Sequence, residues 1–322
     1  MPDEEAAHAR RRVAVSMLAA WMSTRYYRTF HASDEEAAPF DALLTQRERR
    51  IGVTVGALWD EEQPLAGARE LARLLSSDVA DASADDPGYV IWVPPGVLLP
   101  TEEPRRSNLR LALAHGLNGL EPAERREIRL PVTLKLAKIQ DDGQYVSVTG
   151  VLSREWTRIS EGVNGAYHLD SRALHRLPDE SAELEIIVSR VRDRAALLNA
   201  EEVTDVDVHD YWRVSRLPVG GPSGVTVLGA PPETDPADGT LVRRFFRGHV
   251  ARAVEQRTAG DAELVVLVLV GALGHIADEL ATAALRGMNP AAYGALDLVV
   301  LVADGEIRQV LQPRSLPWAQ PR

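Results

Sequence analysis

Hydrophobic positions in the first hundred residues switch between helical and extended spacing. Apolar residues recur every three or four positions in the first segment, as on the buried face of an amphipathic helix. Acids before a proline mark the start of a second helix, and an almost wholly apolar segment after it predicts a buried strand. The predicted elements are a helix over 5–28, strands over 39–44 and 51–58, a helix over 60–75 and a strand over 89–95.

The two strands over 39–44 and 51–58 are separated only by a short polar connection, so we expect them to pair antiparallel. A third helix is predicted over 105–128. The chain then becomes rich in strand signals, with Asp141-Asp142-Gly143 as a turn. The predicted strands of this middle section are 130–139, 144–152, 182–191, 205–214 and 224–229.

The last part of the chain has a different order of predicted elements, in which helices alternate with buried strands. A helix over 241–258 leads to a buried strand, a helix over 276–287 and another buried strand over 296–303, which predicts a parallel crossover. Asp304-Gly305 predicts a tight hairpin into a final strand over 306–311.

These patterns predict an α/β protein in which a mixed sheet is flanked by helices. We expect a core over 1–130, a β-rich middle section over 131–235, and a closing α-β-α-β-β unit over 236–322 that packs on the core. The segment 230–239 has the proline and acid content of a linker.

Composition narrows the chemistry. The 322 residues contain no cysteine, which excludes disulfides, thiolate zinc sites and a cysteine nucleophile. The net charge of −11 argues against a surface that is basic all over, although a local basic groove is compatible with it. The apolar run from Leu264 to Leu273 is about half of the roughly 20 residues of a membrane span, so we expect no membrane partner and a cytoplasmic protein.

The α-β-β-α-β order, with its first two strands so close together, resembles the core of the PD-(D/E)XK nuclease superfamily. In that superfamily an aspartate on one strand and a Glu-x-Lys motif on the next strand meet at a magnesium ion, and Asp41 stands in the aspartate position. The resemblance therefore implies a restriction-endonuclease-like fold over about residues 1–95 and a site for Mg²⁺ or Mn²⁺.

The Glu-x-Lys motif is degenerate in this chain. Thr54-Val55-Gly56 stands at its position, and these residues offer neither a carboxylate nor a cation. A relocated site could use Asp41 with Glu61, from the acids 60–62, and Arg69 or Glu70 on the next helix, of which we select Arg69. The alternative is that these acids only cap the positive end of that helix.

A second candidate is the segment 204–212. Strand alternation places Asp205, Asp207 and His209 on one face, where two carboxylates and an imidazole could hold Mn²⁺, Zn²⁺ or Fe²⁺. A solvated strand face produces the same pattern without a metal.

The helix over 241–258 is the most basic local stretch, and we select Arg243, Arg244 and Arg247 as nucleic-acid contacts. The leading hypothesis is a nuclease-like protein, inactive or with a relocated metal site, that binds nucleic acid or a protein partner. The alternatives are a structural or interaction protein without activity, and a metal-dependent enzyme that uses the 205–209 face.

Overall fold

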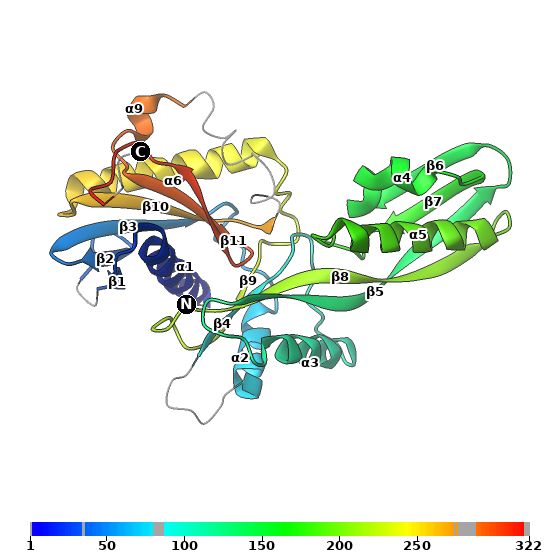
Figure 1. Ribbon diagram of the computed structural model, residues 1–322, viewed down its shortest axis with the longest axis horizontal. Helices are drawn as coiled ribbons and strands as arrows, with labels where there is room; N and C mark the ends of the chain where they lie inside the picture. Colours follow the sequence, from blue (N-terminus) through cyan, green and yellow to red (C-terminus); the bar gives the residue numbers. More distant parts are fainter. Residues whose placement is uncertain (1, 34–35, 80–86, 274, 276–287, 319–322) are drawn as a thin grey trace. The chain divides into compact units, whose positions relative to one another are not determined.

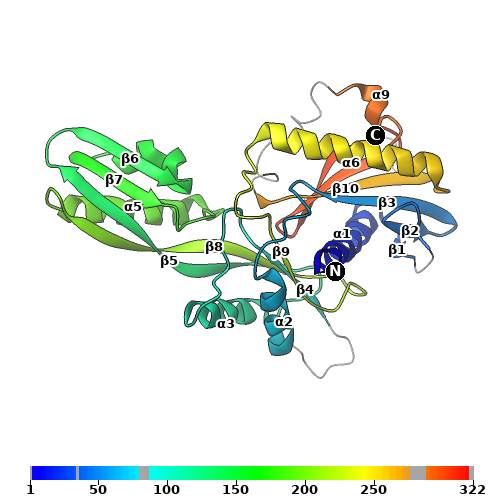
Figure 2. The same ribbon diagram turned by 180° about the vertical axis from the view of Figure 1, so that it is seen from behind.

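The computed structural model describes residues 2–33, 36–79, 87–273, 275 and 288–318 (Figures 1 and 2). The chain forms two compact units, which are described separately below. Unit 1 contains residues 1–126 and 213–322, and unit 2 contains residues 127–212. The fold class is α/β, with two mixed six-stranded sheets. None of the described helices has the length and apolar character that a membrane span needs.

The first sheet lies entirely in unit 1 and has the order β1-β2-β3-β10-β11-β12. Its three central strands run parallel, and β2 and β12 join antiparallel at either side. The sheet therefore contains strands from the beginning of the chain and from its end. Its strands are β1 (His31–Ala32), β2 (Ala42–Gln46), β3 (Arg49–Ala57), β10 (Leu264–Val270), β11 (Leu298–Ala303) and β12 (Glu306–Leu311).

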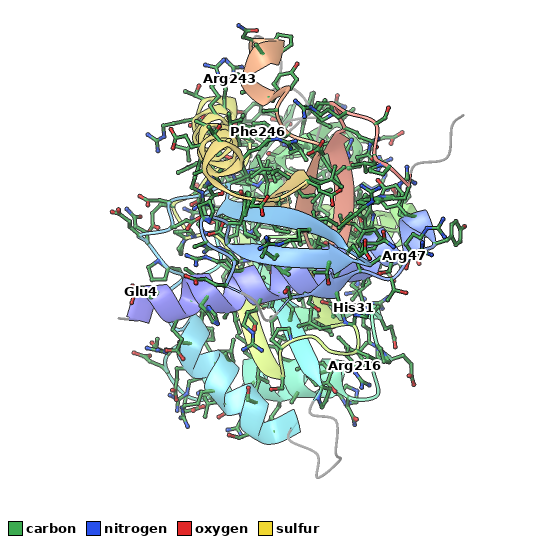
Figure 3. The ribbon with its side chains drawn as sticks, turned by 90° about the vertical axis from the view of Figure 1, so that its left-hand side faces the viewer. Glu4, His31, Arg47, Arg216, Arg243 and Phe246 are labelled. Carbon is green, nitrogen blue, oxygen red and sulfur yellow. The ribbon has the colours of Figure 1, made fainter. Side chains whose placement is uncertain are left out.

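Helices α1 (Pro2–Tyr26) and α6 (Gly239–Ala259) cover opposite faces of this sheet (Figure 3). On β3, Val53 and Val55 belong to the apolar cluster beneath α1, whereas alternate positions face α6. Two of those positions are glycines, because a Cβ on Gly52 would lie 2.5 Å from the Phe40 ring and one on Gly56 would lie 2.2 Å from the His249 ring. The small residues of β3 thus allow α6 to approach closely.

Unit 1 also contains α2 (Ala68–Val79), β4 (Gly88–Trp92), α3 (Arg105–Leu117), β9 (Gly224–Leu228) and α9 (Pro290–Tyr293). Strand β4 is buried along its whole length, as its apolar sequence predicts. It belongs to the second sheet, where it pairs parallel with β9 and antiparallel with residues 213–216 of β8. The third strand of the expected α-β-β-α-β core thus lies in a different sheet from β2 and β3.

Unit 2 is a sheet with helices packed on one face. Leu134, Leu136 and Val208 point from the sheet into a core that α5 completes with Ile187 and Val191. The elements are β5 (Arg125–Gln140), β6 (Gln144–Gly150), a 3-10 turn η1 (Val151–Glu155), α4 (Trp156–Ser160), β7 (Gly165–Ser171), α5 (Ser181–Leu197) and β8 (Val203–Arg216). The order of the second sheet is β6-β7-β5-β8-β4-β9.

Several predicted elements differ from the structure. The segment 182–191 is part of helix α5 and not a strand, because Ile187, Val188 and Val191 pack together at helical spacing. Helix α2 begins at Ala68, later than the acids before Pro64 indicate, and α3 ends at Leu117. Strands β5 and β6 flank β7 and do not pair with each other. The predicted helix over 276–287 lies outside the described residues.

Candidate functional site

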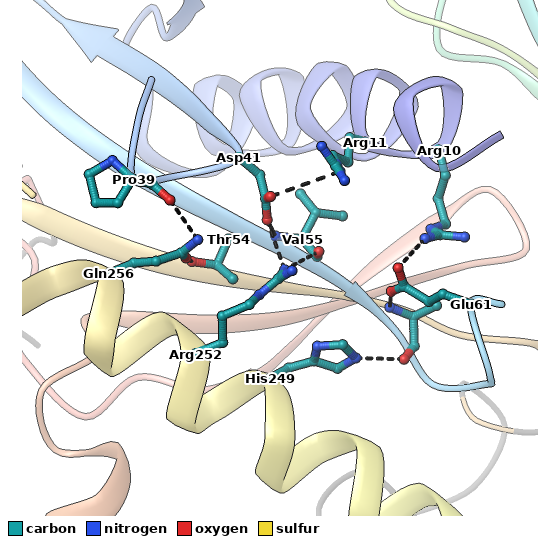
Figure 4. A network of polar contacts seen from close by, with 11 residues as sticks. Arg10, Arg11, Pro39, Asp41, Thr54, Val55, Glu61, His249, Arg252 and Gln256 are labelled. Atoms are coloured by element: carbon teal, nitrogen blue, oxygen red, sulfur yellow. Dashed lines mark hydrogen bonds and ion pairs between the residues drawn. The ribbon is translucent and has the colours of Figure 1, made fainter. Parts of the chain in front are cut away.

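A network of polar side chains closes the open part of the β3 edge (Figure 4). Strand β2 pairs with β3 only as far as Val53, because Ala42 is the last partner in register. Beyond that point the backbone groups of Val55 and Ala57 bond to side chains from other segments. Unpaired backbone groups at a strand edge promote association with other chains, so this network completes the sheet.

Asp41 and Arg252 form hydrogen bonds with the backbone of Val55. The Val55 N–H donates to Asp41 Oδ2 at 2.7 Å, and the Arg252 guanidinium donates to the Val55 carbonyl at 2.6 Å and to Asp41 Oδ2 at 2.8 Å. Arg11 on α1 lies 3.8 Å from the other carboxylate oxygen. The carboxylate of Asp41 is therefore held by a backbone amide and two cations, and its side chain is 10% exposed.

Glu61 and His249 form hydrogen bonds with the backbone of Ala57 in the same way. The Ala57 N–H donates to Glu61 Oε1 at 2.8 Å, and His249 Nε2 donates to the Ala57 carbonyl at 2.7 Å. Glu61 Oε2 pairs with Arg10 of α1 at 2.7 Å. Two acids, one arginine and one histidine thus replace the missing neighbouring strand along four backbone groups.

Thr54 extends the network toward α6. Its hydroxyl donates to the Gln256 side-chain carbonyl, while the Gln256 amide donates to the Pro39 carbonyl at 2.7 Å. Thr54, which stands where the resemblance would place the first residue of a Glu-x-Lys motif, therefore bonds to a helix. It anchors α6 to the segment that precedes β2.

Burial shapes the protonation of two members. Desolvation lowers the pKa of His249, although the hydrogen bond to Ala57 opposes that shift, and the neutral imidazole is favoured. Desolvation also lowers the pKa of Arg10, and the neighbouring Glu61 acts in the opposite direction. Each buried cation of the network has a carboxylate beside it, as low-dielectric surroundings require.

The three predicted catalytic residues, Asp41, Glu61 and Arg69, make different contacts. Asp41 and Glu61 both belong to the network, but each is occupied by an arginine and a backbone amide. Arg69 pairs with Glu5 of α1 at an exposed position. Within the described ranges, no group of three or more His, Asp or Glu side chains is arranged to hold a metal ion.

The 205–209 face is a solvated part of β8. Asp205 pairs with Lys135 at 2.5 Å and Asp207 accepts from the Thr133 hydroxyl at 2.9 Å, both on the neighbouring strand β5. Asp205 and Asp207 are exposed and His209 is half-buried, so the predicted alternation is present. The carboxylates bond to β5 across the strand pair.

Helix α6 carries two sets of arginines. Arg252 and Arg257 turn toward the sheet, where they bond to Asp41 and to the buried Asp297. Arg243, Arg244 and Arg247 are exposed, and no carboxylate within the described part of the chain pairs with any of them. At about 100° per residue these three fall within an arc of about 100°, so they form one stripe.

Sequence reasoning missed the contacts of Arg252, His249 and Gln256, which lie about 200 residues from β3 along the chain. Their spacing is the one available signal, because His249, Arg252 and Gln256 recur every three or four positions on α6. The sequence gives no indication of which strand that helical face meets.

No protein-family model, no curated protein and no solved structure matches this chain.

Proposed function

We propose that this protein binds the phosphate backbone of nucleic acid through the arginine stripe of α6, formed by Arg243, Arg244 and Arg247. The observation that carries the proposal is that these three exposed guanidinium groups share one face and have no carboxylate partner among the described residues. A guanidinium group suits phosphate because its planar donors match two phosphate oxygens.

The surroundings of the stripe support this role. All three arginines lie in the first nine residues of α6, and no acidic residue occurs in its first turn. Gly248 borders the stripe, and a Cβ at that position would meet nothing within 4 Å, so a bulky ligand has access. The net charge of −11 then belongs to other surfaces, and binding depends on this local patch.

The network at β3 supports a binding role over metal-dependent hydrolysis. A nuclease carboxylate must offer oxygen lone pairs to a divalent ion. Here arginine and backbone donors already occupy the carboxylates of Asp41 and Glu61. We therefore propose a nuclease-like protein that contacts nucleic acid without cutting it.

The test is fluorescence anisotropy with labelled single-stranded DNA, duplex DNA and RNA over a range of salt concentrations. Replacing Arg243, Arg244 and Arg247 with alanine should reduce the slope of log K against log salt by about 2 to 3, since each lost phosphate contact removes about 0.7 to 0.9. Absence of binding to all three nucleic acids at low salt would contradict the proposal and favour a protein partner.

The matched control removes three other exposed arginines, Arg73, Arg106 and Arg158, each of which pairs with an acid three residues earlier. This variant has the same net charge as the test variant, and we expect wild-type binding. Incubation of the labelled strands with Mg²⁺ or Mn²⁺ should leave them intact. Cleavage that is lost in Asp41→Asn would instead support a metal-dependent nuclease.

A further inference from the structure

Unit 2 contains a buried carboxylate whose donors include an imidazole. Asp210 of β8 is 2% exposed, and its Oδ1 accepts from the backbone amides of His175 at 3.0 Å and Arg176 at 2.8 Å. Its Oδ2 accepts from Trp212 Nε1 at 2.9 Å and contacts His175 Nδ1 at 3.1 Å. The carboxylate is thus held in place by two backbone amides, the Trp212 indole and the His175 ring.

This arrangement determines the tautomer of His175. An ionised carboxylate only accepts hydrogen bonds, so Nδ1 carries the proton and the lone pair of the neutral ring lies on Nε2. The His175 side chain is 24% exposed, and Nε2 has no hydrogen-bond partner in the described part of the chain. The ring is therefore oriented from behind, and its basic nitrogen is accessible.

The other histidines with described contacts lack this combination. His249 uses Nε2 to donate to the Ala57 carbonyl, and His275 is completely buried. Among the described residues, His168 forms its side-chain hydrogen bond with the Ser147 hydroxyl, at 3.3 Å, and not with a carboxylate. An imidazole held by a buried carboxylate is the arrangement that makes a histidine an effective nucleophile or base.

We propose that His175 is a nucleophilic site whose Nε2 accepts a phosphoryl group from an acyl phosphate, with Asp210 as its positioning residue. The Nε2 lone pair forms the N–P bond while the P–O bond to the acyl group breaks, and the carboxylate leaving group takes that electron pair. The Nδ1 proton stays in place, and the negative charge of Asp210 offsets the positive charge on the ring.

Phosphoryl transfer suits this site because the nucleophile has no proton to lose. A hydroxyl nucleophile needs a separate general base, whereas Nε2 attacks directly once the ring is oriented and neutral. Catalysis of phosphoryl transfer depends mainly on positioning and electrostatics, and the fixed Asp210–His175 pair provides both for the acceptor.

The experiment incubates the full chain with acetyl phosphate, followed by intact mass and peptide mapping at neutral pH. We expect one phosphoryl group on His175, lost in His175→Gln and retained in His209→Gln, which removes a half-buried histidine of the same unit. Phosphorylation in Asp210→Asn should be slower by at least about tenfold, because an amide at this position disturbs the tautomer.

Two results would overturn the proposal. One is phosphorylation spread over the histidines according to their exposure in the wild-type chain, and the other is an acetyl group on His175 without a phosphoryl group. If circular dichroism shows that Asp210→Asn does not fold, the distribution of phosphoryl groups over the histidines of the wild-type chain still tests the proposal. In that case Trp212→Phe, which removes one donor and leaves the imidazole contact, should retain phosphorylation at His175.

Discussion

Asp41 of unit 1 and Asp210 of unit 2 are both carboxylates that accept hydrogen bonds from N–H donors, but their side-chain partners differ in chemistry. Asp41 is 10% exposed and meets a guanidinium group, whereas Asp210 is 3% exposed in its side chain and meets an imidazole. Arginine stays charged at any ordinary pH, so the Asp41 contact is permanent and ends within the protein. The imidazole has a second nitrogen, so the Asp210 contact orients an atom that faces solvent.

The comparison shows that burial of an acid does not by itself mark a reactive site. The side-chain partner of the acid determines its role. Arg252 is a cation that bonds to a backbone carbonyl and to the Asp41 carboxylate together, and it thereby completes a strand edge. His175 has a second, accessible ring nitrogen, and the contact with Asp210 fixes the orientation of that nitrogen. Four measurements test this difference, beginning with the largest expected effect.

Asp210→Ala should destabilise the protein by about 4 kcal/mol, because it leaves several buried N–H donors without an acceptor at an almost fully enclosed position. Urea unfolding followed by circular dichroism measures the loss. Asp142→Ala, in the turn between β5 and β6, is the control and should change stability by less than about 0.5 kcal/mol. A loss below about 1 kcal/mol would mean that water replaces the carboxylate.

His275 has no carboxylate partner among the residues that the structure describes, so it sharpens the contrast with His175. Its Nδ1 accepts from the Ala272 amide at 2.9 Å, and burial lowers its pKa to about 4. The unfolded chain binds the proton more readily, with a pKa of about 6.5, so this group makes stability fall by roughly 3 kcal/mol as the pH decreases from 6.5 to 4.

Unfolding by urea at pH 7 and at pH 4.5 measures this effect. His275→Asn keeps an acceptor for the Ala272 amide and removes the titrating ring, so its stability should depend less on pH across that range. Equal pH dependence in the variant and the wild type would assign the loss to other groups, including His249, whose pKa burial also lowers.

Asp41→Ala should cost about 2 kcal/mol, less than Asp210→Ala, because Arg252 is 38% exposed and can turn toward water. Asp41→Asn retains an acceptor for the Val55 amide and should lose about half as much. Because the change opens the β3 edge, size-exclusion chromatography should also show association at high protein concentration. A larger loss than in Asp210→Ala would reverse the comparison.

Lys135→Ala should change stability by less than about 1 kcal/mol, since the pair with Asp205 is solvated on both sides. Asp205 is the exposed carboxylate that is compared with the buried carboxylates Asp41 and Asp210. Thermal unfolding measures the change in stability, and a loss above about 2 kcal/mol would mean that the 205–209 face is more constrained than its exposure indicates.

Local sequence predicted much of the architecture. The apolar strands of the first sheet and the helices 5–28 and 241–258 follow from hydrophobic spacing, which depends only on neighbouring residues. Asp304-Gly305 predicted the last hairpin for a local reason too, because both residues adopt positive φ, at 58° and 77°. The segment 182–191 misled because Ile186, Ile187 and Val188 are consecutive, and a short apolar run fits a strand or a buried helix equally well.

The candidate sites depended on contacts between distant segments. Asp41 stands out in the sequence, but its partner Arg252 comes from a helix more than 200 residues away, and Asp210 meets His175 across 35 residues. Hydrophobic spacing determined which residues form helices and strands, since that choice is local. Only the tertiary structure decided which charges neutralise each other and which nitrogen stays accessible, because those outcomes depend on the partner that packing brings within hydrogen-bonding distance.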